Sequence, residues 1–274
     1  MSSLDESVVA GWREHIGRQE VRQQRLDIEG SRRFAAAIGA STDVRQHLPP
    51  LGHWAYFVEV APPDQIGADG HPKRGGLMPP VTLPRRMFAS AITEFQEPLA
   101  LDDNAELTIS IVDVRHRTGK TGDLVFVDVD RRLDQNGRTR LTERQTIVYR
   151  DVGDPVPPVS PSAEAPAADA CWTPNEVDLL RFSAATFNSH RIHYDWPYAT
   201  AVEGYPGLVV HGPFTAARLY ALAQSASPTP MRRFEFRALA PLFVGQPIYL
   251  VRGEDEVRAV RCDGATAMTA RASF

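Results

Sequence analysis

The sequence predicts an α+β fold that consists of two similar halves. Two observations predict it. Each half has helical segments followed by long strands with alternating apolar residues, and the order of these segments is the same in both halves. A stretch rich in proline and alanine separates them. The repeated order indicates an internal duplication, with an antiparallel sheet and helices in each copy.

The separating stretch reads DVGDPVPPVSPSAEAPAADA and covers residues 151–170. Proline stiffens the backbone and removes N–H donors, so such a segment is expected to be extended and to form no structure of its own. The expected organisation is therefore an N-terminal half over 1–150, a linker over 151–170 and a C-terminal half over 171–274.

One amphipathic helix is predicted near the start of each half. DIEGSRRFAAAIGAS begins at Asp27, and TPNEVDLLRFSAATFNS begins at Thr173, with RFAAA and RFSAA aligned without gaps. We expect Thr173 to be the N-cap, Pro174 the first helical residue and Glu176 the partner in a capping box.

A second helix is predicted in each half, starting at a proline. The segments are PRRMFASAITEFQ from Pro84 and PFTAARLYALAQSA from Pro213, both with apolar residues at helical spacing. Long alternating strands follow each segment, and the dipeptides Asn136-Gly137 and Asp263-Gly264 indicate hairpin turns between them.

Composition limits the classes of function. The chain has 274 residues, 43% of them hydrophobic and 23% charged, with a formal net charge of −4. A net negative charge does not indicate the basic surface that nucleic-acid-binding proteins have. The two cysteines are too few for a disulfide framework. The N-terminus has no basic start or apolar run, and no stretch elsewhere approaches the length of a membrane span. We expect a cytoplasmic protein without a membrane partner.

One segment concentrates residues that can carry chemistry. Residues 182–199 read FSAATFNSHRIHYDWPYA, and EGYPGLVVHGPF follows shortly after. Asn188 precedes His193 by five positions, and Gly212 directly precedes the helix that starts at Pro213.

This segment resembles the motif of the MaoC-like hydratase/dehydratase family. His193 matches the family's catalytic histidine, Asn188 stands at the place of its aspartate, and His190 and Arg191 stand where asparagine and proline are usual. The form FNSHRIHYD is similar to a branch that includes mesaconyl-CoA and itaconyl-CoA hydratases and hydroxyacyl-thioester dehydratases. Further likeness in DGHPKRGGLMPP and LTERQTIVYRD extends the resemblance over nearly the whole chain.

The resemblance implies a double hot-dog fold, in which each half wraps its sheet around a central helix. It also implies an acyl-CoA thioester as substrate and no separate cofactor, since coenzyme A is part of the substrate. The expected reaction is hydration of a short, branched dicarboxylyl enoyl-CoA, itaconyl-CoA or mesaconyl-CoA, to citramalyl-CoA, and an itaconyl-CoA hydratase is favoured.

Hydration of an unsaturated thioester needs a base for water, a proton donor to the α-carbon and donors to the thioester oxygen. His193 is the expected base, because a histidine is largely neutral at physiological pH. Asn188 can orient water but cannot accept a proton. The Gly212 amide, at a helix N-terminus, is the expected oxyanion donor. His190 and Tyr194 are candidates for a second participant.

His211 is expected to orient groups beside Gly212. The first half has no histidine at the spacing of His193, so one site per chain is expected, with the loop DGHPKRGGLMPP lining a substrate tunnel. Arg74, Arg85 and Arg86 could each meet a phosphate or a substrate carboxylate.

Several alternatives stay open on the sequence. His190, His193 and Asp195 could instead bind a metal, although the pattern lacks a recognisable remote ligand and no metal is expected. The chain could be a 3-hydroxyacyl-thioester dehydratase of fatty-acid-type chains, a hot-dog thioesterase or a non-catalytic acyl-CoA-binding protein. A homodimer is also left open. Four other histidines, His15, His47, His53 and His116, are expected to be structural.

Overall fold

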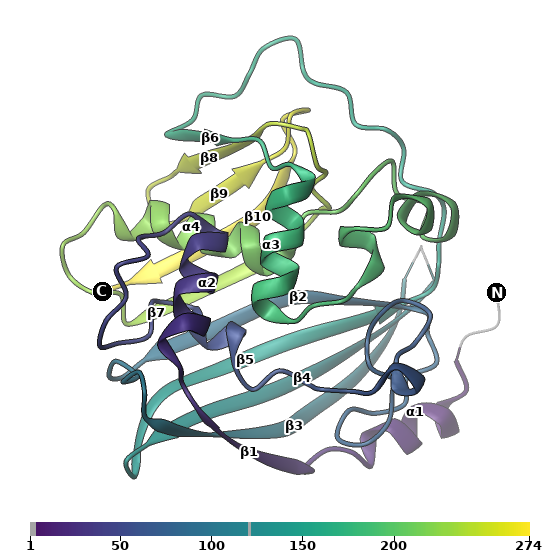
Figure 1. The fold of residues 1–274 in the computed structure, drawn as a ribbon. Helices are drawn as coiled ribbons and strands as arrows, with labels where there is room; N and C mark the ends of the chain where they lie inside the picture. The colour runs from purple at the N-terminus through teal and green to yellow at the C-terminus, as the bar shows by residue number, and fades with distance from the viewer. Residues whose placement is uncertain (1–3, 120–121) are drawn as a thin grey trace.

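The computed structural model describes residues 4–119 and 122–274, and its strands form one antiparallel sheet with the order β1-β3-β4-β5-β2-β7-β10-β9-β8-β6. Figure 1 shows this sheet passing without a break from the first half to the second. The strands are β1 (Gln19–Arg25), β2 (Arg85–Phe95), β3 (Asn104–Gly119), β4 (Gly122–Gln135), β5 (Arg138–Arg150), β6 (Ala170–Trp172), β7 (Arg233–Ala238), β8 (Ile248–Arg252), β9 (Val257–Val260) and β10 (Thr266–Ser273).

Helices and short helical turns precede or connect the strands. The α-helices of the described ranges are α1 (Glu6–Arg13), α2 (Ile28–Ile38), α3 (Glu176–Thr186) and α4 (Gly212–Gln224). Short helical turns are η1 (Gly52–Ala55), η2 (Pro63–Gln65), η3 (Arg191–His193) and the π-helical η4 (Tyr198–Val202). One helix was predicted near the start of each half, and these helices are α2 and α3. They pack against each other in front of the sheet (Figure 1).

The two halves meet where β2 pairs with β7. Ser90 lies opposite Arg237, and the register continues to Glu94 opposite Arg233. On its other edge β2 pairs with β5 over its full length, with a bulge between Phe88 and Ser90. β2 therefore has hydrogen-bonded neighbours on both sides.

Two hydrophobic cores lie against the sheet, and the one around α4 also receives Phe34, Leu51 and Ala91 from the first half. In the second half α4 is buried against β8, β9 and β10, with Phe214, Leu219 and Phe236 among the fully buried side chains. In the first half the sheet is covered by α1 and by the segment between α2 and β2, which contributes Tyr56 and Val81 to the core. The buried side chains alternate along the strands, as the sequence predicted.

The helix predicted from Pro84 is wrong, because Arg85–Phe95 forms strand β2. Its apolar residues fit a helical period locally, yet β5 and β7 offer backbone partners on both edges. Tertiary pairing of this kind overrides local propensity. The second predicted helix of this pair, from Pro213, is confirmed as α4.

The start of α3 also differs from the prediction. The N-cap is Asn175, whose side chain accepts from the Asp178 backbone N–H while the Asp178 carboxylate accepts from the Asn175 N–H. Pro174 stays outside the helix, where its carbonyl accepts from the Gly245 N–H at 2.8 Å. A capping box is present, but two residues later than expected from Thr173.

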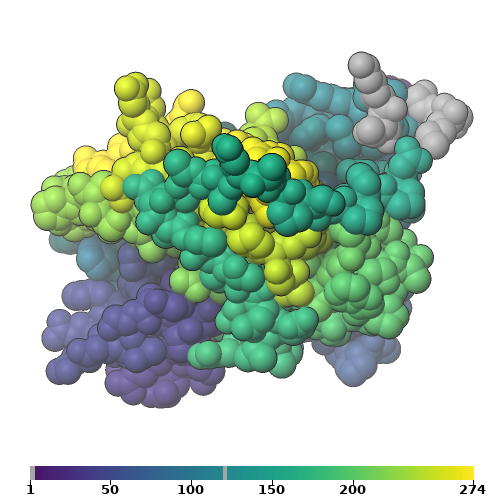
Figure 2. All heavy atoms as spheres, turned by 90° about the horizontal axis from the view of Figure 1, so that it is seen from above, coloured from purple at the N-terminus to yellow at the C-terminus, as the bar shows by residue number. Residues whose placement is uncertain are grey.

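Residues 151–169 form no helix or strand and cross the surface over the C-terminal strands, as Figure 2 shows. They are tied down at intervals, for example by the Val156 N–H to the Gly204 carbonyl and the Ser162 N–H to the Cys262 carbonyl, both at 2.8 Å. The segment thus forms no helix or strand up to residue 169, and the domain boundaries stay a prediction.

Two further expectations were that the chain has no disulfide framework and no membrane span. Cys171 and Cys262 are both free thiols. In the described ranges, no helix combines the length and the apolar character that crossing a membrane requires.

Candidate active site

A cavity of about 950 Å³ lies between the two halves and receives residues from both. The first half contributes the loop around His71 and strand β2, and the second half contributes the region after α3 and the start of α4. His193 and Gly212 both line this one cavity. The two groups that the sequence placed at the centre of the chemistry can thus reach one molecule.

His193 ends the short helical turn η3 and is almost completely buried. Its Nδ1 lies 2.7 Å from the Val209 carbonyl oxygen. A carbonyl can only accept, so Nδ1 carries the hydrogen and Nε2 keeps its lone pair. Burial lowers the pKa of His193 to about 4, although the Val209 hydrogen bond opposes this. At neutral pH the side chain is therefore an uncharged base.

His211, just before α4, stacks on His193 with the ring centroids 3.6 Å apart. Its Nε2 lies 2.8 Å from the Ser183 hydroxyl, and this bond joins it to α3. Burial holds the pKa of His211 well below its usual range. His211 thus packs against the ring of His193, in addition to its place directly before Gly212, and also lines the cavity.

Gly212 is the first residue of α4, and its amide N–H donates no hydrogen bond to the described residues. A Cβ at this position would meet only the Phe88 carbonyl at 3.7 Å and the Met268 methyl at 3.9 Å. Both are ordinary contacts. The fold itself does not demand glycine here, whereas close approach of a ligand to this amide would.

Asn188 follows the left-handed C-cap Phe187 that ends α3. Its side-chain oxygen accepts from the His190 backbone N–H at 3.0 Å, and the residue lines the cavity. Tyr194 does not line the cavity: it is 47% exposed, and its hydroxyl donates to the Ser189 carbonyl. Of these two candidates, the structure brings Asn188 to the cavity and leaves Tyr194 at the surface.

The three candidate arginines all line the cavity but differ in their partners. Arg74 donates to the carbonyls of Val81, Leu83 and Pro84, so it holds its own loop. Arg85 is 4% exposed and forms an ion pair with Glu203, Nε to Oε2 at 3.0 Å. Arg86 forms no ion pair with the described residues, and its charge acts on His71 and His190. Arg86, which lies beside Tyr149, is therefore the candidate whose charge has no carboxylate partner among the described residues.

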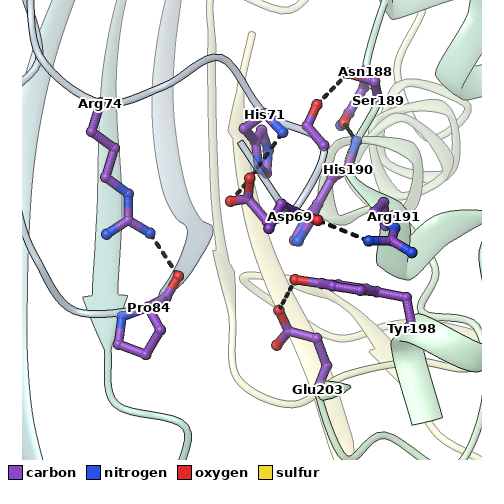
Figure 3. A network of polar contacts seen from close by, with 12 residues as sticks. Asp69, His71, Arg74, Pro84, Asn188, Ser189, His190, Arg191, Tyr198 and Glu203 are labelled. Atoms are coloured by element: carbon purple, nitrogen blue, oxygen red, sulfur yellow. Dashed lines mark hydrogen bonds and ion pairs between the residues drawn. The ribbon is translucent and has the colours of Figure 1, made fainter. Parts of the chain in front are cut away.

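Sequence reasoning missed the pair formed by Asp69 and His71. Figure 3 shows these side chains from the first-half loop beside His190 of the second half. The His71 Nδ1 lies 3.1 Å from Asp69 Oδ2, and the His71 and His190 ring centroids are 4.2 Å apart. The ring of His190 is in turn 5.5 Å from that of His193. The first half thus adds the imidazole of His71, paired with the Asp69 carboxylate, to the rings of His190, His193 and His211. Together they form a row of four imidazoles.

The loop with Asp69 is fixed to the second half by its backbone. The Arg191 N–H donates to the Asp69 carbonyl at 2.9 Å, and the Ser189 hydroxyl donates to the Gly70 carbonyl. Gly70 has a φ of +89°, and a Cβ there would lie 2.0 Å from the Ser189 carbonyl oxygen. The glycine between Asp69 and His71 is what permits this approach.

Burial and charge set the protonation of this row. Burial lowers the pKa of His190 to about 2, and the charges of His71 and His193 act in the same direction. Burial also lowers the pKa of His71, while the hydrogen bond to Asp69 partly offsets it. Burial raises the pKa of Asp69, but the hydrogen bonds from His71 outweigh it and hold the carboxyl below its usual range. The carboxylate is ionised beside an imidazole.

The metal alternative considered from the sequence is not assembled. Asp195 pairs with Arg191 at 2.7 Å, and among the described residues it forms no group of possible ligands with His190 and His193. A different set, Asp69, His71 and His190, has ligand atoms within 4.8 Å of one another. The positive charges of Arg74 and Arg86 both act on His71, which opposes binding of a cation there.

Three of the four histidines expected to be structural have intrachain partners. His53 Nε2 lies 3.1 Å from the buried Glu143, His116 Nε2 lies 2.8 Å from Asp123, and His15 Nδ1 lies 3.0 Å from the Leu77 carbonyl. None of these three lines the cavity.

Comparison with known proteins gives consistent results. The sequence profile of hydroxyacyl-thioester dehydratase type 2 matches residues 50–244. A mesaconyl-C(4)-CoA hydratase of Chloroflexus aurantiacus is 42% identical over 272 residues, covering 95% of this chain and 97% of that protein. The mitochondrial hydroxyacyl-thioester dehydratase type 2 of Schizosaccharomyces pombe is 27% identical over 234 residues, covering 76% of this chain and 78% of that protein.

Solved structures agree on the fold. The crystal structure of HtdX from Mycobacterium tuberculosis superposes with a TM-score of 0.68 at 17% identity, covering 93% of this chain and 99% of that one. A second Mycobacterium tuberculosis protein, described as a double hotdog fold, superposes with a TM-score of 0.55 at 14% identity, covering 94% and 95%. The double hot-dog fold expected from the sequence is confirmed, with the first half lacking the predicted helix from Pro84.

Proposed function

Since the chain belongs to the hydroxyacyl-thioester dehydratase type 2 family of MaoC-like enzymes, we propose that it hydrates mesaconyl-CoA to citramalyl-CoA. At the coarser level it is an acyl-CoA hydratase, a hydro-lyase with a thioester substrate. The observation that carries the proposal is that the free Nε2 of His193 and the free N–H of Gly212 line one cavity.

In the proposed reaction His193 removes a proton from water as the oxygen attacks the β-carbon. A neutral imidazole suits this step, and the Val209 carbonyl fixes the tautomer that leaves Nε2 free. Negative charge then develops on the thioester oxygen. The Gly212 N–H at the start of α4 would stabilise it, and one such donor typically lowers a barrier by about 3 kcal/mol.

The choice of a dicarboxylyl substrate rests on Arg86. In mesaconyl-CoA with the thioester conjugated to the double bond, the free carboxylate sits on the β-carbon that water attacks. Its binding partner must therefore lie close to the base. Arg86 lies near the imidazole row and forms no ion pair with the described residues, and a guanidinium binds a carboxylate with two parallel hydrogen bonds.

Itaconyl-CoA would give the same product and is the second dicarboxylyl candidate. Its double bond is not conjugated with the thioester carbonyl, so charge would not develop on the oxygen that faces Gly212. We therefore favour mesaconyl-CoA, in agreement with the name of the 42% identical relative.

Dehydration of a 3-hydroxyacyl thioester is the second candidate function. It is the same chemistry in reverse, and it is the reaction named for the Schizosaccharomyces pombe relative. The cavity of about 950 Å³ continues along apolar side chains of β3, β4 and β5, among them Ile109, Val129 and Ile147. These residues favour a longer acyl chain.

A thioester panel tests the proposal. Mesaconyl-, itaconyl-, crotonyl- and 2-dodecenoyl-CoA are incubated with the protein, and the gain of one water is followed by mass spectrometry. We expect the highest kcat/KM for mesaconyl-CoA. A preference for dodecenoyl-CoA would favour the dehydratase, and release of free coenzyme A, followed with a thiol reagent, would favour a thioesterase. No turnover of any thioester would contradict hydratase activity altogether.

A further inference from the structure

A second group capable of proton transfer faces the cavity from the first half. Of the four imidazoles that line it, His71 is the one among the described residues whose ring nitrogen is hydrogen-bonded to a carboxylate, that of Asp69 at 3.1 Å. His190 lies between the rings of His71 and His193, with centroid distances of 4.2 Å and 5.5 Å. The ring of His190 thus separates His71 from His193, the proposed base.

We propose that Asp69 and His71 form a second acid–base pair. This pair donates and removes the proton at the substrate's α-carbon, while His193 removes the proton from water. This role rests on the proposed hydratase function and deepens it. Asn188, which follows α3 beside the base, has no proton to exchange, so the second half supplies no carboxylate of its own at that position.

The hydrogen bonds of the pair suit this role. Asp69 Oδ2 accepts from the His71 ring, and Oδ1 accepts from the His71 backbone N–H at 3.0 Å. The ring therefore presents Nε2 to the cavity, and the ionised carboxylate favours the imidazolium form. His193 is bonded to a neutral carbonyl instead. Burial lowers the pKa of both rings, but of the two His71 has the carboxylate that partly offsets this, so the two imidazoles differ in how readily they hold a proton, the difference that separates an acid from a base.

The balance of the step is complete without another reactant. His193 Nε2 takes a proton from water, and the oxygen bonds to the β-carbon. The electron pair of the double bond moves to the α-carbon, which takes a proton from the His71 imidazolium. His193 then releases its proton to solvent and His71 recovers one. One water has been added, and reversal of the same steps gives dehydration.

The pair is held at the site by backbone contacts rather than by its own side chains. The Gly67 N–H donates to the His71 carbonyl at 2.7 Å, and the Arg191 N–H donates to the Asp69 carbonyl at 2.9 Å. The Arg191 guanidinium also donates to the Ala68 carbonyl at 3.0 Å. His71 is therefore positioned by the segment that carries His193, and Figure 3 shows how closely the two segments meet.

A saturated thioester separates this inference from the proposed function. Butyryl-CoA cannot be hydrated, but its α-hydrogens can exchange with D₂O if a group at the α-carbon removes and returns a proton. We expect the wild-type protein to catalyse this exchange, followed by mass spectrometry. His71→Gln should reduce it by about a hundredfold or more, a larger loss than His193→Gln causes.

Asp69→Asn tests the role of the charge. The amide oxygen can still accept from the His71 backbone N–H, so the loop is kept while the carboxylate is lost. Without the carboxylate the imidazolium is less favoured, so the pKa of His71 falls. The alkaline limb of the kcat profile for hydration should therefore move to lower pH.

His116→Gln is the matched control. His116 and Asp123 form a pair of the same kind at 2.8 Å, outside the cavity. This variant should keep both exchange and hydration, and thermal unfolding checks that all variants fold. Exchange that is lost in His193→Gln but kept in His71→Gln would overturn the pair, as would absence of exchange in the wild type. So would a stoichiometric bound metal whose removal by a chelator abolishes exchange. Exchange without hydration of any enoyl-CoA would instead contradict only the proposed function.

Discussion

His193 and His211 stack with an angle of 21° between their ring planes and 3.6 Å between their centroids. Each ring has one nitrogen in a hydrogen bond, His193 to the Val209 carbonyl and His211 to the Ser183 hydroxyl. Two neutral rings can stack in this way, whereas a charge on either would be buried against its neighbour. The stack therefore favours the neutral, basic form of His193.

Replacing His193 with Gln should lower kcat for hydration of mesaconyl-CoA by about a thousandfold, since general base catalysis typically contributes 10²–10⁴-fold. Gln can still donate to the Val209 carbonyl but cannot take a proton from water. Steady-state kinetics check the prediction, with circular dichroism as the test of folding. If the variant kept a tenth of the activity, His193 would have no part in proton transfer.

The stability of the fold should decrease as the pH falls from 7 to 5. Burial lowers the pKa of His193 to about 4 and of His190 to about 2 in the folded chain, against about 6.5 when unfolded. Between these values the unfolded chain binds more protons. The contribution of each histidine is therefore complete above pH 6.5 and is lost as the pH falls toward the folded-state pKa. Thermal melts at pH 7.5 and 5.0 measure this, and His193→Gln should show a smaller decrease than wild type.

Replacing Arg86 with Met should lower kcat/KM for mesaconyl-CoA at least tenfold more than for crotonyl-CoA, which lacks the carboxylate. Loss of a charged partner for a buried carboxylate costs roughly 2–5 kcal/mol, and about 1.4 kcal/mol is already tenfold. Arg85→Met should mainly destabilise the fold, because Glu203 would lose its buried partner. Equal effects of Arg86→Met on both thioesters would argue against carboxylate recognition.

Alanine at Gly212 should reduce kcat/KM about a hundredfold and leave the melting temperature nearly unchanged. The added methyl group has room in the fold, with its closest contact at 3.7 Å, but it would stand between the amide and the thioester oxygen. Gly11→Ala in α1 is a matched control, since it also adds a methyl group to a helix and meets nothing within 4 Å. Unchanged kinetics in Gly212→Ala would remove this amide from the mechanism.

Alanine at Gly70 should destabilise the protein by about 2 kcal/mol or more and lower kcat. It combines a positive φ with a Cβ only 2.0 Å from the Ser189 carbonyl oxygen, so the loop has to move away from the site. Gly75→Ala also has a positive φ, of +121°, but meets nothing within 4 Å. Urea unfolding of both variants separates backbone strain from the clash, and the prediction requires a larger loss for Gly70→Ala.

Most strands could be predicted because their buried residues alternate, as in β3 and β4. The segment after Pro84 could not. Met87 to Ile92 contains small and apolar residues that fit either period, and only the presence of β5 and β7 on its two edges decides for a strand. The choice between helix and strand here depends on pairing partners that are distant in the sequence, and the local spacing of apolar residues does not reveal it.

The candidate site was predicted where the motif is continuous in sequence, from Asn188 to Gly212, and missed where it is not. Asp69 and His71 precede His190 by more than a hundred residues, and their loop reaches it through backbone contacts with Ser189 and Arg191. The signal that could have revealed them is the acidic residue, glycine and histidine in direct succession. An aspartate before a glycine readily accepts from the backbone two residues on, which here fixes the histidine.

The ladder between β2 and β7 has a dynamic consequence. Backbone opening in a sheet starts at its outermost strands, here β1 and β6, whereas the amides of Ser90 to Glu94 are protected by neighbours on both edges. Fluctuations that loosen the periphery leave this central strand in place. The loop that precedes β2 is thus attached to a strand whose amides we expect to exchange slowly with solvent.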